Sequence, residues 1–145
     1  MTFDEIFEEW EKDSKIDPSN LAMESLNTHV LHGKYYKYYI DEKRIFNKAQ
    51  QYYDQLKVQK FEFYRYGETA ETREKGWKLP EGGARMTDKT VEPYLATDPD
   101  LAKIALQIST SREKLDLLKD IAKTVLQRSF LIKNAIEFIK FQNGQ

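Results

Sequence analysis

Two short stretches of the chain combine aromatic rings with positively charged side chains. The first, Lys34–Tyr39, reads KYYKYY and holds four tyrosines and two lysines, and the second, Lys60–Tyr66, reads KFEFYRY. Aromatic rings stack on unpaired bases and cationic side chains neutralise phosphates, so this mixture suits single-stranded nucleic acid. The chemistry that these residues indicate is binding by stacking and charge, with no reaction.

Helical spacing arranges these residue types into two lines. Spacings of 7, 4, 3 and 4 place one stripe of rings and cations on a helix: Phe46, Tyr53, Lys57, Lys60 and Tyr64. Spacings of 7 and 4 give a second, basic line: Lys37, Arg44 and Lys48. We predict that Tyr53, Lys57, Lys60 and Tyr64, the basic line and Arg65 bind single-stranded DNA without reading its sequence. Two alternatives stay open: the aromatic stripe belongs to the core, and the basic line is an ordinary solvated face.

The residue types indicate neither a catalytic site nor a metal site. The chain has no cysteine, so it offers no thiolate ligand and no cysteine nucleophile. His29 and His32 lie three positions apart on one helical face, but no HExxH pattern accompanies them. We expect a protein that is not an enzyme and that uses no cofactor and no metal ion.

The charges are segregated along the chain although the whole chain carries only −1. Residues 1–33 hold eight acids and two bases, whereas residues 34–65 hold eight bases and four acids. Residues 66–100 return to a net −3, and residues 101–145 carry a net +4. Two basic segments can therefore bind a polyanion locally.

Length and composition favour one domain, or a small domain with extended arms, in a reducing compartment. The first residues, MTFDEIFEEWEKD, are acidic where a signal peptide would be basic. No apolar run approaches the roughly 20 residues that a membrane span requires. We predict a cytoplasmic protein.

Helical signals divide the first half of the chain into two helices. Apolar residues at helical spacing predict a short amphipathic helix over residues 2–13 with an acidic outer face. Asp17 as an N-cap and Pro18 at the first helical position predict that a second helix starts there. Since no proline interrupts the chain from Leu21 to about Tyr64, this helix is expected to reach roughly 65 Å before Gly67 ends it.

The segment 67–97 is rich in residues that break helices. It contains Gly76, Pro80, Gly82, Gly83 and Pro93. We expect an irregular segment in which residues 87–96 form at most a short strand or hairpin, confined to an edge by Pro93.

The C-terminal part is predicted to be a second long helix. Asp98 and Pro99 repeat the cap-and-proline signal, and nothing interrupts residues 101–141. Ten apolar residues occupy a and d positions of a heptad repeat: Leu101, Ile104, Ile108, Leu115, Leu118, Ala122, Val125, Ile132, Ile136 and Ile139. Such a seam, broken only at Ser111 and Ser129, is typical of helices that associate between subunits as a coiled coil or bundle. The alternative is that the seam packs only on the first long helix.

The predicted fold is therefore mainly α. It has two long helices, a short N-terminal helix and the irregular middle segment. We divide the chain into an N-terminal helical DNA-binding region (1–66), the loop segment (67–97) and a C-terminal helical oligomerisation region (98–145).

The order and spacing of many residues resemble the UvsY family, the recombination mediators of tailed phages. The resemblance covers almost the whole chain and is carried in the first half by Ile16, Asp17, Leu21, Glu24, Asn27, Leu31, Lys34, Tyr35, Lys60, Tyr64 and Gly67. In the second half it is carried by Leu95, Asp98, Asp100, Leu101, Lys103, Arg128, Phe130, Ile132, Lys133 and Phe141.

This resemblance implies a non-enzymatic protein of the phage-infected cell that binds single-stranded DNA as a homo-oligomer of six or seven subunits. It also implies loading of a RecA-like recombinase in competition with a single-strand-binding protein. The family's basic DNA-binding motif falls at Lys60, with Lys57 close by, but Val58 replaces one of its lysines. The competing interpretation is a structural coiled-coil adaptor without DNA binding.

Overall fold

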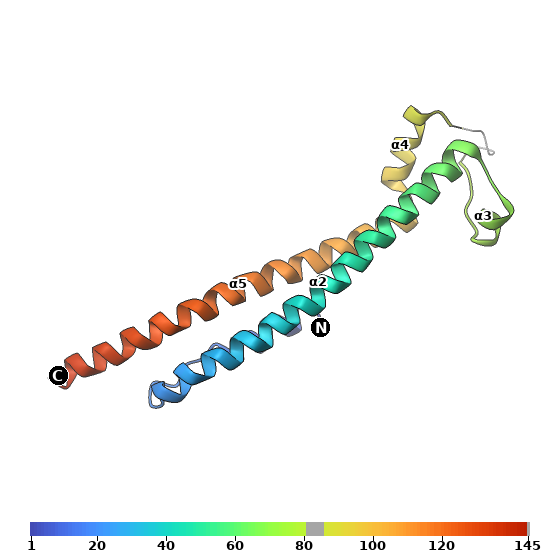
Figure 1. Ribbon diagram of the computed structural model, residues 1–145. Coiled ribbons are helices and arrows are strands. Elements are labelled where there is room, and N and C mark those ends of the chain that lie inside the picture. Colours follow the sequence, from blue (N-terminus) through green and yellow to red (C-terminus); the bar gives the residue numbers. More distant parts are fainter. Residues whose placement is uncertain (81–85, 145) are drawn as a thin grey trace. The chain divides into compact units, whose positions relative to one another are not determined.

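The computed structural model describes residues 1–80 and 86–144, and these residues form five α-helices (Figure 1). The helices are α1 (Phe3–Asp13), α2 (Leu21–Tyr66), α3 (Ala70–Glu74), α4 (Asp88–Thr97) and α5 (Pro99–Gln142). The prediction of a mainly α fold with two long helices and a short N-terminal helix is confirmed. The chain divides into unit 1 (Met1–Ile45 and Ser111–Gln145) and unit 2 (Phe46–Thr110), and the long helices contribute to both.

Unit 1 packs α1 and the first part of α2 against the second part of α5. Its core consists of Ile6, Leu31, Tyr35, Leu118, Ile121 and Val125. The amphipathic helix predicted over residues 2–13 is confirmed as α1, which a capping box between Thr2 and Glu5 starts. The ring of Trp10 meets Tyr35 edge-on at 5.2 Å between centroids, so α1 covers the aromatic part of α2.

The start of α2 differs from the prediction by one turn. The carboxylate of Asp17 accepts hydrogen bonds from the backbone and side chain of Ser19, at 2.9 and 2.6 Å, and therefore closes a turn instead of capping the helix. The first bond of the helix runs from the Glu24 N–H to the carbonyl of Asn20. The cap-and-proline signal marked the right region, but α2 begins at Leu21 because Asp17 is used by the turn.

Unit 2 contains the second part of α2, α3, α4 and the first part of α5. Its core consists of Leu56, Phe63, Tyr64, Val91, Leu95 and Leu101. The expectation of a strand or hairpin over residues 87–96 is wrong, because this segment is α4. Helical spacing brings Val91 and Leu95 onto one buried face, and this burial outweighs the one backbone hydrogen bond that Pro93 removes. The centre of the predicted irregular segment, residues 81–85, lies outside the described residues.

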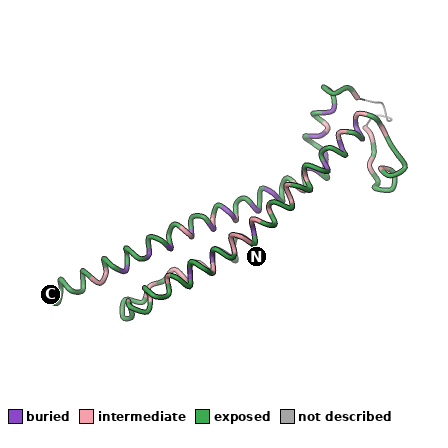
Figure 2. Tube along the Cα trace, in the orientation of Figure 1, coloured by how far each residue is buried: buried purple, intermediate pink, exposed green. Residues whose placement is uncertain are grey.

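The seam of α5 is used inside the single chain. Asp98 caps α5 by accepting hydrogen bonds from the backbone N–H groups of Asp100 and Leu101, as the sequence predicted. Six seam residues are buried, namely Leu101, Ile108, Leu115, Leu118, Val125 and Ile132, and their regular recurrence is visible along α5 (Figure 2). Ile104, Ala122 and Ile136 are half-buried, and Ile139 is exposed. Within each unit the seam therefore packs on the first long helix, which is the second of the two expectations. Contact between subunits through these residues stays a prediction.

The polar interruption of the seam at Ser111 has a partner in unit 1. Its hydroxyl donates a 2.6 Å hydrogen bond to the carboxylate of Glu42, which also pairs with Lys114 at 3.2 Å. Both Ser111 and Glu42 are buried. A satisfied buried pair of this kind fixes the register of two helices more strictly than apolar contacts do.

Candidate nucleic-acid interface

The two predicted lines lie on opposite faces of α2. Lys48 and Lys57 are nine positions apart, which at 100° per residue corresponds to half a turn. In unit 2 the aromatic stripe faces inward: Tyr53 packs against the core, and Lys60 and Tyr64 are buried. The basic line, Lys37, Arg44 and Lys48, is exposed. The core alternative therefore describes most of the aromatic stripe, and its role in DNA binding stays a prediction.

Lys60 is the centre of a buried cluster in unit 2. Its ammonium lies 3.2 Å from Asp98 and 2.8 Å from Asp100, and 4.0 Å from the centroid of the Trp77 ring. The hydroxyl of Tyr64 donates a 2.6 Å hydrogen bond to Asp98, one of the two carboxylate partners of this lysine. Together these contacts tie α2, the start of α5 and the segment after α3 into one cluster.

The electrostatics of the cluster favour a charged Asp98. Burial by itself raises the pKa of this carboxyl, but hydrogen bonds from Tyr64 and the Leu101 N–H and the charge of Lys60 hold the pKa below its ordinary value. Burial and the same hydrogen bond raise the pKa of Tyr64. The phenol thus stays a donor and the carboxylate an acceptor.

The remaining predicted residues of unit 2 are more accessible. Lys57 is exposed and lines a shallow cavity that also holds the acids Asp54 and Glu92. Arg65 is half-buried, and its Nε donates to Asp88 at 2.7 Å. Acidic neighbours reduce the attraction of both cations for phosphate, whereas Lys48, the fourth predicted cation of this unit, is exposed.

The KYYKYY stretch serves mainly to hold α1 in unit 1. Lys34 pairs with Glu9 and Asp13, each at 2.6 Å, and these contacts raise its pKa against the opposing effect of burial. Tyr35 donates to Asp13 at 2.8 Å and Tyr38 donates to Glu9 at 3.0 Å. The acidic and basic segments that the sequence separates are therefore joined here.

A second ion pair, between buried Arg128 and half-buried Glu24, was not singled out as functional from the sequence. Arg128 pairs with Glu24 and also donates to the carbonyls of Asp13 and Ser14, at 3.4 and 3.5 Å, so it links α5 to α2 and to the end of α1. Charged residues are rarely buried unless paired. Glu24 and Arg128 are 104 positions apart in the sequence, so nothing there indicates that they pair.

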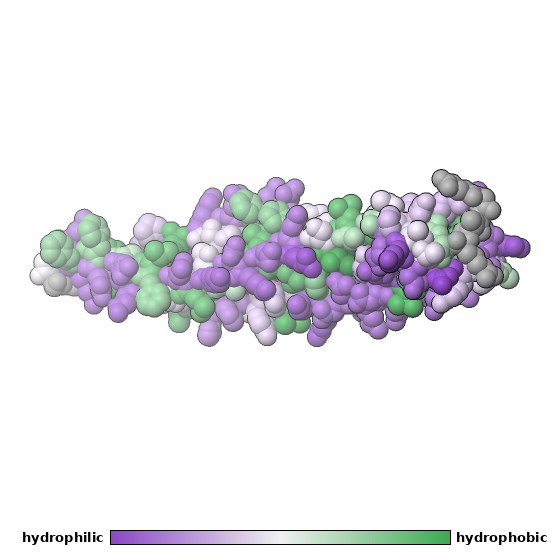
Figure 3. Space-filling view, turned by 90° about the horizontal axis from the view of Figure 1, so that it is seen from above, coloured by the Kyte–Doolittle hydropathy of each residue, from purple (hydrophilic) through white to green (hydrophobic). Residues whose placement is uncertain are grey.

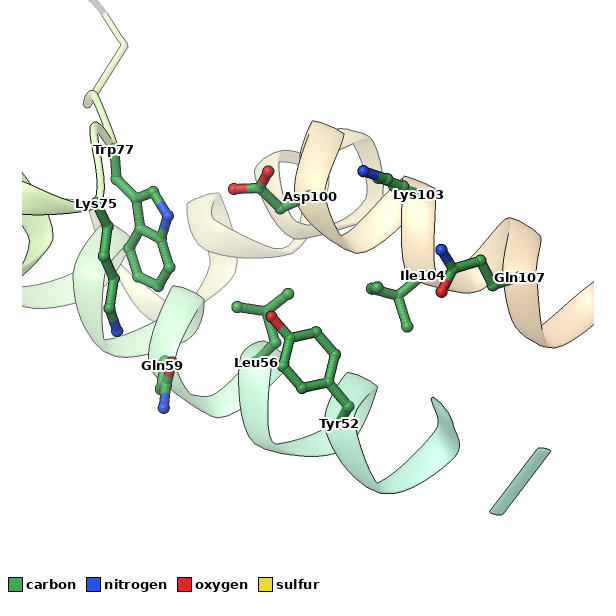
Figure 4. Close-up of a pocket in the computed structure, with 9 residues that line it drawn as sticks. All are labelled: Tyr52, Leu56, Gln59, Lys75, Trp77, Asp100, Lys103, Ile104 and Gln107. Carbon is green, nitrogen blue, oxygen red and sulfur yellow. The ribbon is translucent and has the colours of Figure 1, made fainter. Parts of the chain in front are cut away.

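An open cavity of about 480 Å³ lies in unit 2 (Figure 4). Three elements line it: α2 through Tyr52, Leu56 and Gln59, the segment after α3 through Lys75 and Trp77, and α5 through Asp100, Lys103, Ile104 and Gln107. We call it the Tyr52–Trp77 pocket. Sequence reasoning missed it, and the available signal was the spacing of Lys48, Tyr52 and Gln59, 4 and 7 positions apart, on the exposed face of α2.

Two other classes of site are absent from the described parts of the chain. None of the helices there is long and apolar enough to cross a membrane. Within residues 1–80 and 86–144, no group of three or more acidic or histidine side chains is arranged to hold a metal ion.

Comparison with known proteins gives a consistent result. The family model of "recombination, repair and ssDNA binding protein UvsY" matches residues 9–145. Crystal structures of the bacteriophage T4 recombination mediator protein UvsY match with TM-scores of 0.80 and 0.81, at 19% and 20% identity. These matches cover 98% and 99% of this chain and 99% and 98% of the T4 chains. No curated protein sequence matches. The shared fold and the match over residues 9–145 lead to one conclusion: the chain belongs to the UvsY family.

Proposed function

We propose that this protein binds single-stranded DNA as a homo-oligomer in recombination and repair and loads a RecA-like recombinase in competition with a single-strand-binding protein. The family match over residues 9–145 is the observation that carries this proposal. The role needs no catalysis and no cofactor, because binding and displacement require only differential affinity. Six or seven subunits are the number that the family resemblance implies.

We place the main phosphate contacts on the exposed line of α2. Lys37, Arg44 and Lys48 are exposed, whereas Lys60 has two carboxylate partners and little access to solvent. Lys37 and Arg44 pair with Asp41 at 3.0 and 4.0 Å, but exposed pairs of this kind exchange easily for another anion. Lys57 is also exposed but lies on the opposite face of α2.

Replacing Arg44 and Lys48 by alanine together is expected to weaken binding to labelled oligo-dT and to flatten its salt dependence. Each phosphate contact on a single strand contributes about 0.7 to the slope of log K against log salt, so losing two lowers the slope by about 1.4. Fluorescence anisotropy at several salt concentrations measures this slope. The fold should persist because both side chains are exposed.

The matched control is Lys119→Ala with Lys123→Ala. These lysines are also exposed and four positions apart, but they lie on α5 in unit 1. The control should keep the wild-type slope. If the Arg44/Lys48 variant keeps it too, the phosphate contacts lie elsewhere, and if the wild-type protein ignores oligo-dT even at low salt, the adaptor interpretation is correct.

We propose that exposed apolar side chains of unit 1 join the subunits. On α5 they are Leu126, Phe130, Leu131, Phe138 and Phe141, and on α2 they are Met23, Leu26 and Val30. Green apolar side chains gather at the end of unit 1 where α5 finishes (Figure 3, left). Exposed apolar side chains that cluster in this way are characteristic of an interface. The buried seam then supports the oligomer by holding the helices that present these side chains.

Leu126→Asp with Phe130→Asp is expected to convert the oligomer into smaller species without unfolding the chain. Light scattering measures the mass, and circular dichroism checks the helix content. Leu106→Asp is the matched control, since Leu106 also lies on α5 and is 68% exposed, compared with 65% for Leu126. An unchanged mass for the double variant would remove this surface from the interface.

Oligomerisation would make weak contacts effective. Several copies of the basic line engage one strand, and each contact after the first is intramolecular, so the overall affinity exceeds that of a single subunit. A strand held in this way is bound less firmly by its single-strand-binding protein. The recombinase then meets a strand that is easier to occupy.

A further inference from the structure

Two aromatic side chains border the Tyr52–Trp77 pocket: Tyr52 is exposed, and Trp77 is half-buried against the core of unit 2. Tyr52 lines the cavity from α2 and is 54% exposed. Trp77 borders the cavity from the segment after α3 (Figure 4). Accessible tyrosine and tryptophan rings at a concave site are typical of surfaces on which planar groups stack.

Buried groups fix the position of Trp77. The Lys60 ammonium lies 4.0 Å from the centroid of its ring, and Phe63 meets it edge-on at 5.5 Å. Because Lys60 is itself held by Asp98 and Asp100, the indole is attached to the buried cluster and needs little ordering when a ligand binds. Lys60 is thus a positioning residue for this wall of the pocket.

The charges around the pocket suit an anion with an aromatic part. Lys75 and Lys103 line it on different elements, one before Trp77 and one on α5. The only acid among the lining residues, Asp100, lies 2.8 Å from Lys60, and because this lysine also pairs with Asp98, the charge of Asp100 is only partly compensated. Lys75 pairs with Glu71 at 3.5 Å, but an exposed pair of this kind exchanges easily for another anion, so Lys75 and Lys103 can both attract phosphates that flank a bound group.

The size and the polar groups of the pocket agree with this chemistry. A volume of about 480 Å³ lies within the usual range of small-ligand sites, about 300 to 1,000 Å³. Leu56 and Ile104 supply an apolar floor, and the amides of Gln59 and Gln107 can donate to or accept from the edge of a base. Lys48 lies one helical turn before Tyr52 on the same face of α2, which continues the basic line into the pocket.

We propose that the Tyr52–Trp77 pocket takes one nucleobase of the bound single strand, stacked against Tyr52 and Trp77, with its flanking phosphates on Lys75 and Lys103. This inference rests on the proposed function, because it concerns the same DNA. It assigns stacking to a different pair of rings from the buried aromatic stripe. Binding remains independent of sequence, since every base has a face that stacks.

The test compares oligo-dT with an oligonucleotide of equal length whose central residues are abasic. The two probes carry the same phosphates, so the ratio of their dissociation constants reports the bases alone. The wild-type protein is expected to prefer oligo-dT, and Tyr52→Ala is expected to reduce this preference about tenfold for each base contact that is lost. Tyr36→Ala is the matched control, because Tyr36 is another tyrosine of α2 with a similar exposure of 56% but lies outside the pocket.

Tryptophan emission supplies a second readout. The chain contains only two tryptophans, Trp10 in unit 1 and Trp77 in the pocket. In a Trp10→Phe variant, oligo-dT should quench the remaining emission of Trp77, whereas in a Trp77→Phe variant it should leave the emission of Trp10 unchanged.

The outcomes separate the pocket from the proposed function. If the protein binds oligo-dT but Tyr52→Ala keeps the wild-type ratio, or if both probes bind equally well, the pocket proposal is overturned and the function stands. If the wild-type protein binds neither probe, the proposed function fails and the pocket proposal fails with it. Loss of the preference in Tyr52→Ala, but not in Tyr36→Ala, together with quenching of Trp77 supports the pocket.

Discussion

Lys60→Ala is expected to lower the free energy of unfolding by about 3–5 kcal/mol, the usual effect of removing one partner from a buried ion pair. The substitution leaves the buried carboxylate of Asp98 without its cation and removes the contact with Trp77. Urea unfolding followed by circular dichroism measures the change. Since the whole stability of a domain is about 5–15 kcal/mol, this is a large fraction.

The two aspartates around Lys60 provide an internal control. Asp100 lies closer to the lysine than Asp98, at 2.8 against 3.2 Å, but its side chain is 54% exposed whereas that of Asp98 is 1% exposed. Asp98 is buried, caps α5 and accepts from Tyr64, so Asp98→Ala should destabilise the chain strongly, and Asp100→Ala by about 1 kcal/mol or less. Equal effects of the two would contradict this explanation.

The position of Lys60 also affects how binding experiments are interpreted. A Lys60 variant that loses DNA binding can do so through the buried cluster or through Trp77, without any contact between Lys60 and a phosphate. Binding by such a variant should therefore be compared at a temperature at which it remains folded. Under that condition, an unchanged salt slope with a reduced base preference identifies a positioning residue, and a lower slope identifies a phosphate contact.

Arg128→Met is expected to be similarly destabilising, by about 3–5 kcal/mol. The change leaves the carboxylate of Glu24 without its partner and removes the donors to the carbonyls of Asp13 and Ser14 at the end of α1. Loss of these contacts should loosen α1 first. Hydrogen exchange of α1 amides and urea unfolding measure the local and the global effect.

The control for Arg128 tests whether the loss comes from burial of the pair or simply from removal of one positive charge. Lys37→Met removes an exposed pair with Asp41, four positions away on α2, and should change stability by about 0.5 kcal/mol or less. The double variant Glu24→Met, Arg128→Met should recover much of the loss, because no unpaired charge is left inside. A double variant as unstable as the sum of the two single variants would show that the two residues do not interact, and would contradict this explanation.

Local signals in the sequence predicted most of the helices. The capping residue Asp98 with Pro99, the glycine at Gly67 and the periodicity of α5 each act within a few neighbouring residues, and each prediction agrees with the structure. The errors arose where two local signals compete. Asp17 can cap a helix or close a turn, and Pro93 opposes a helix that Val91 and Leu95 favour, so the outcome depends on burial by distant segments.

The candidate site was predicted less completely than the fold. Composition and spacing identified α2 as the basic and aromatic helix. Which of its faces is exposed depends on the segments that pack on it, and the sequence does not show these. The spacing of Lys48, Tyr52 and Gln59 indicated one wall of the pocket, but the whole pocket could not be predicted, because Tyr52, Trp77 and Lys103 come from segments separated by 25 residues or more along the chain.

The sequence by itself determined that this chain is a mainly helical member of the UvsY family, with two long helices and segregated charges. Only the tertiary structure decided that Tyr53, Lys60 and Tyr64 face the core of unit 2 while Lys37, Arg44 and Lys48 face solvent. The physical reason is that helical periodicity fixes which residues share a face, whereas the buried partners, here Asp98 and the apolar side chains of α4 and α5, select the face that turns inward.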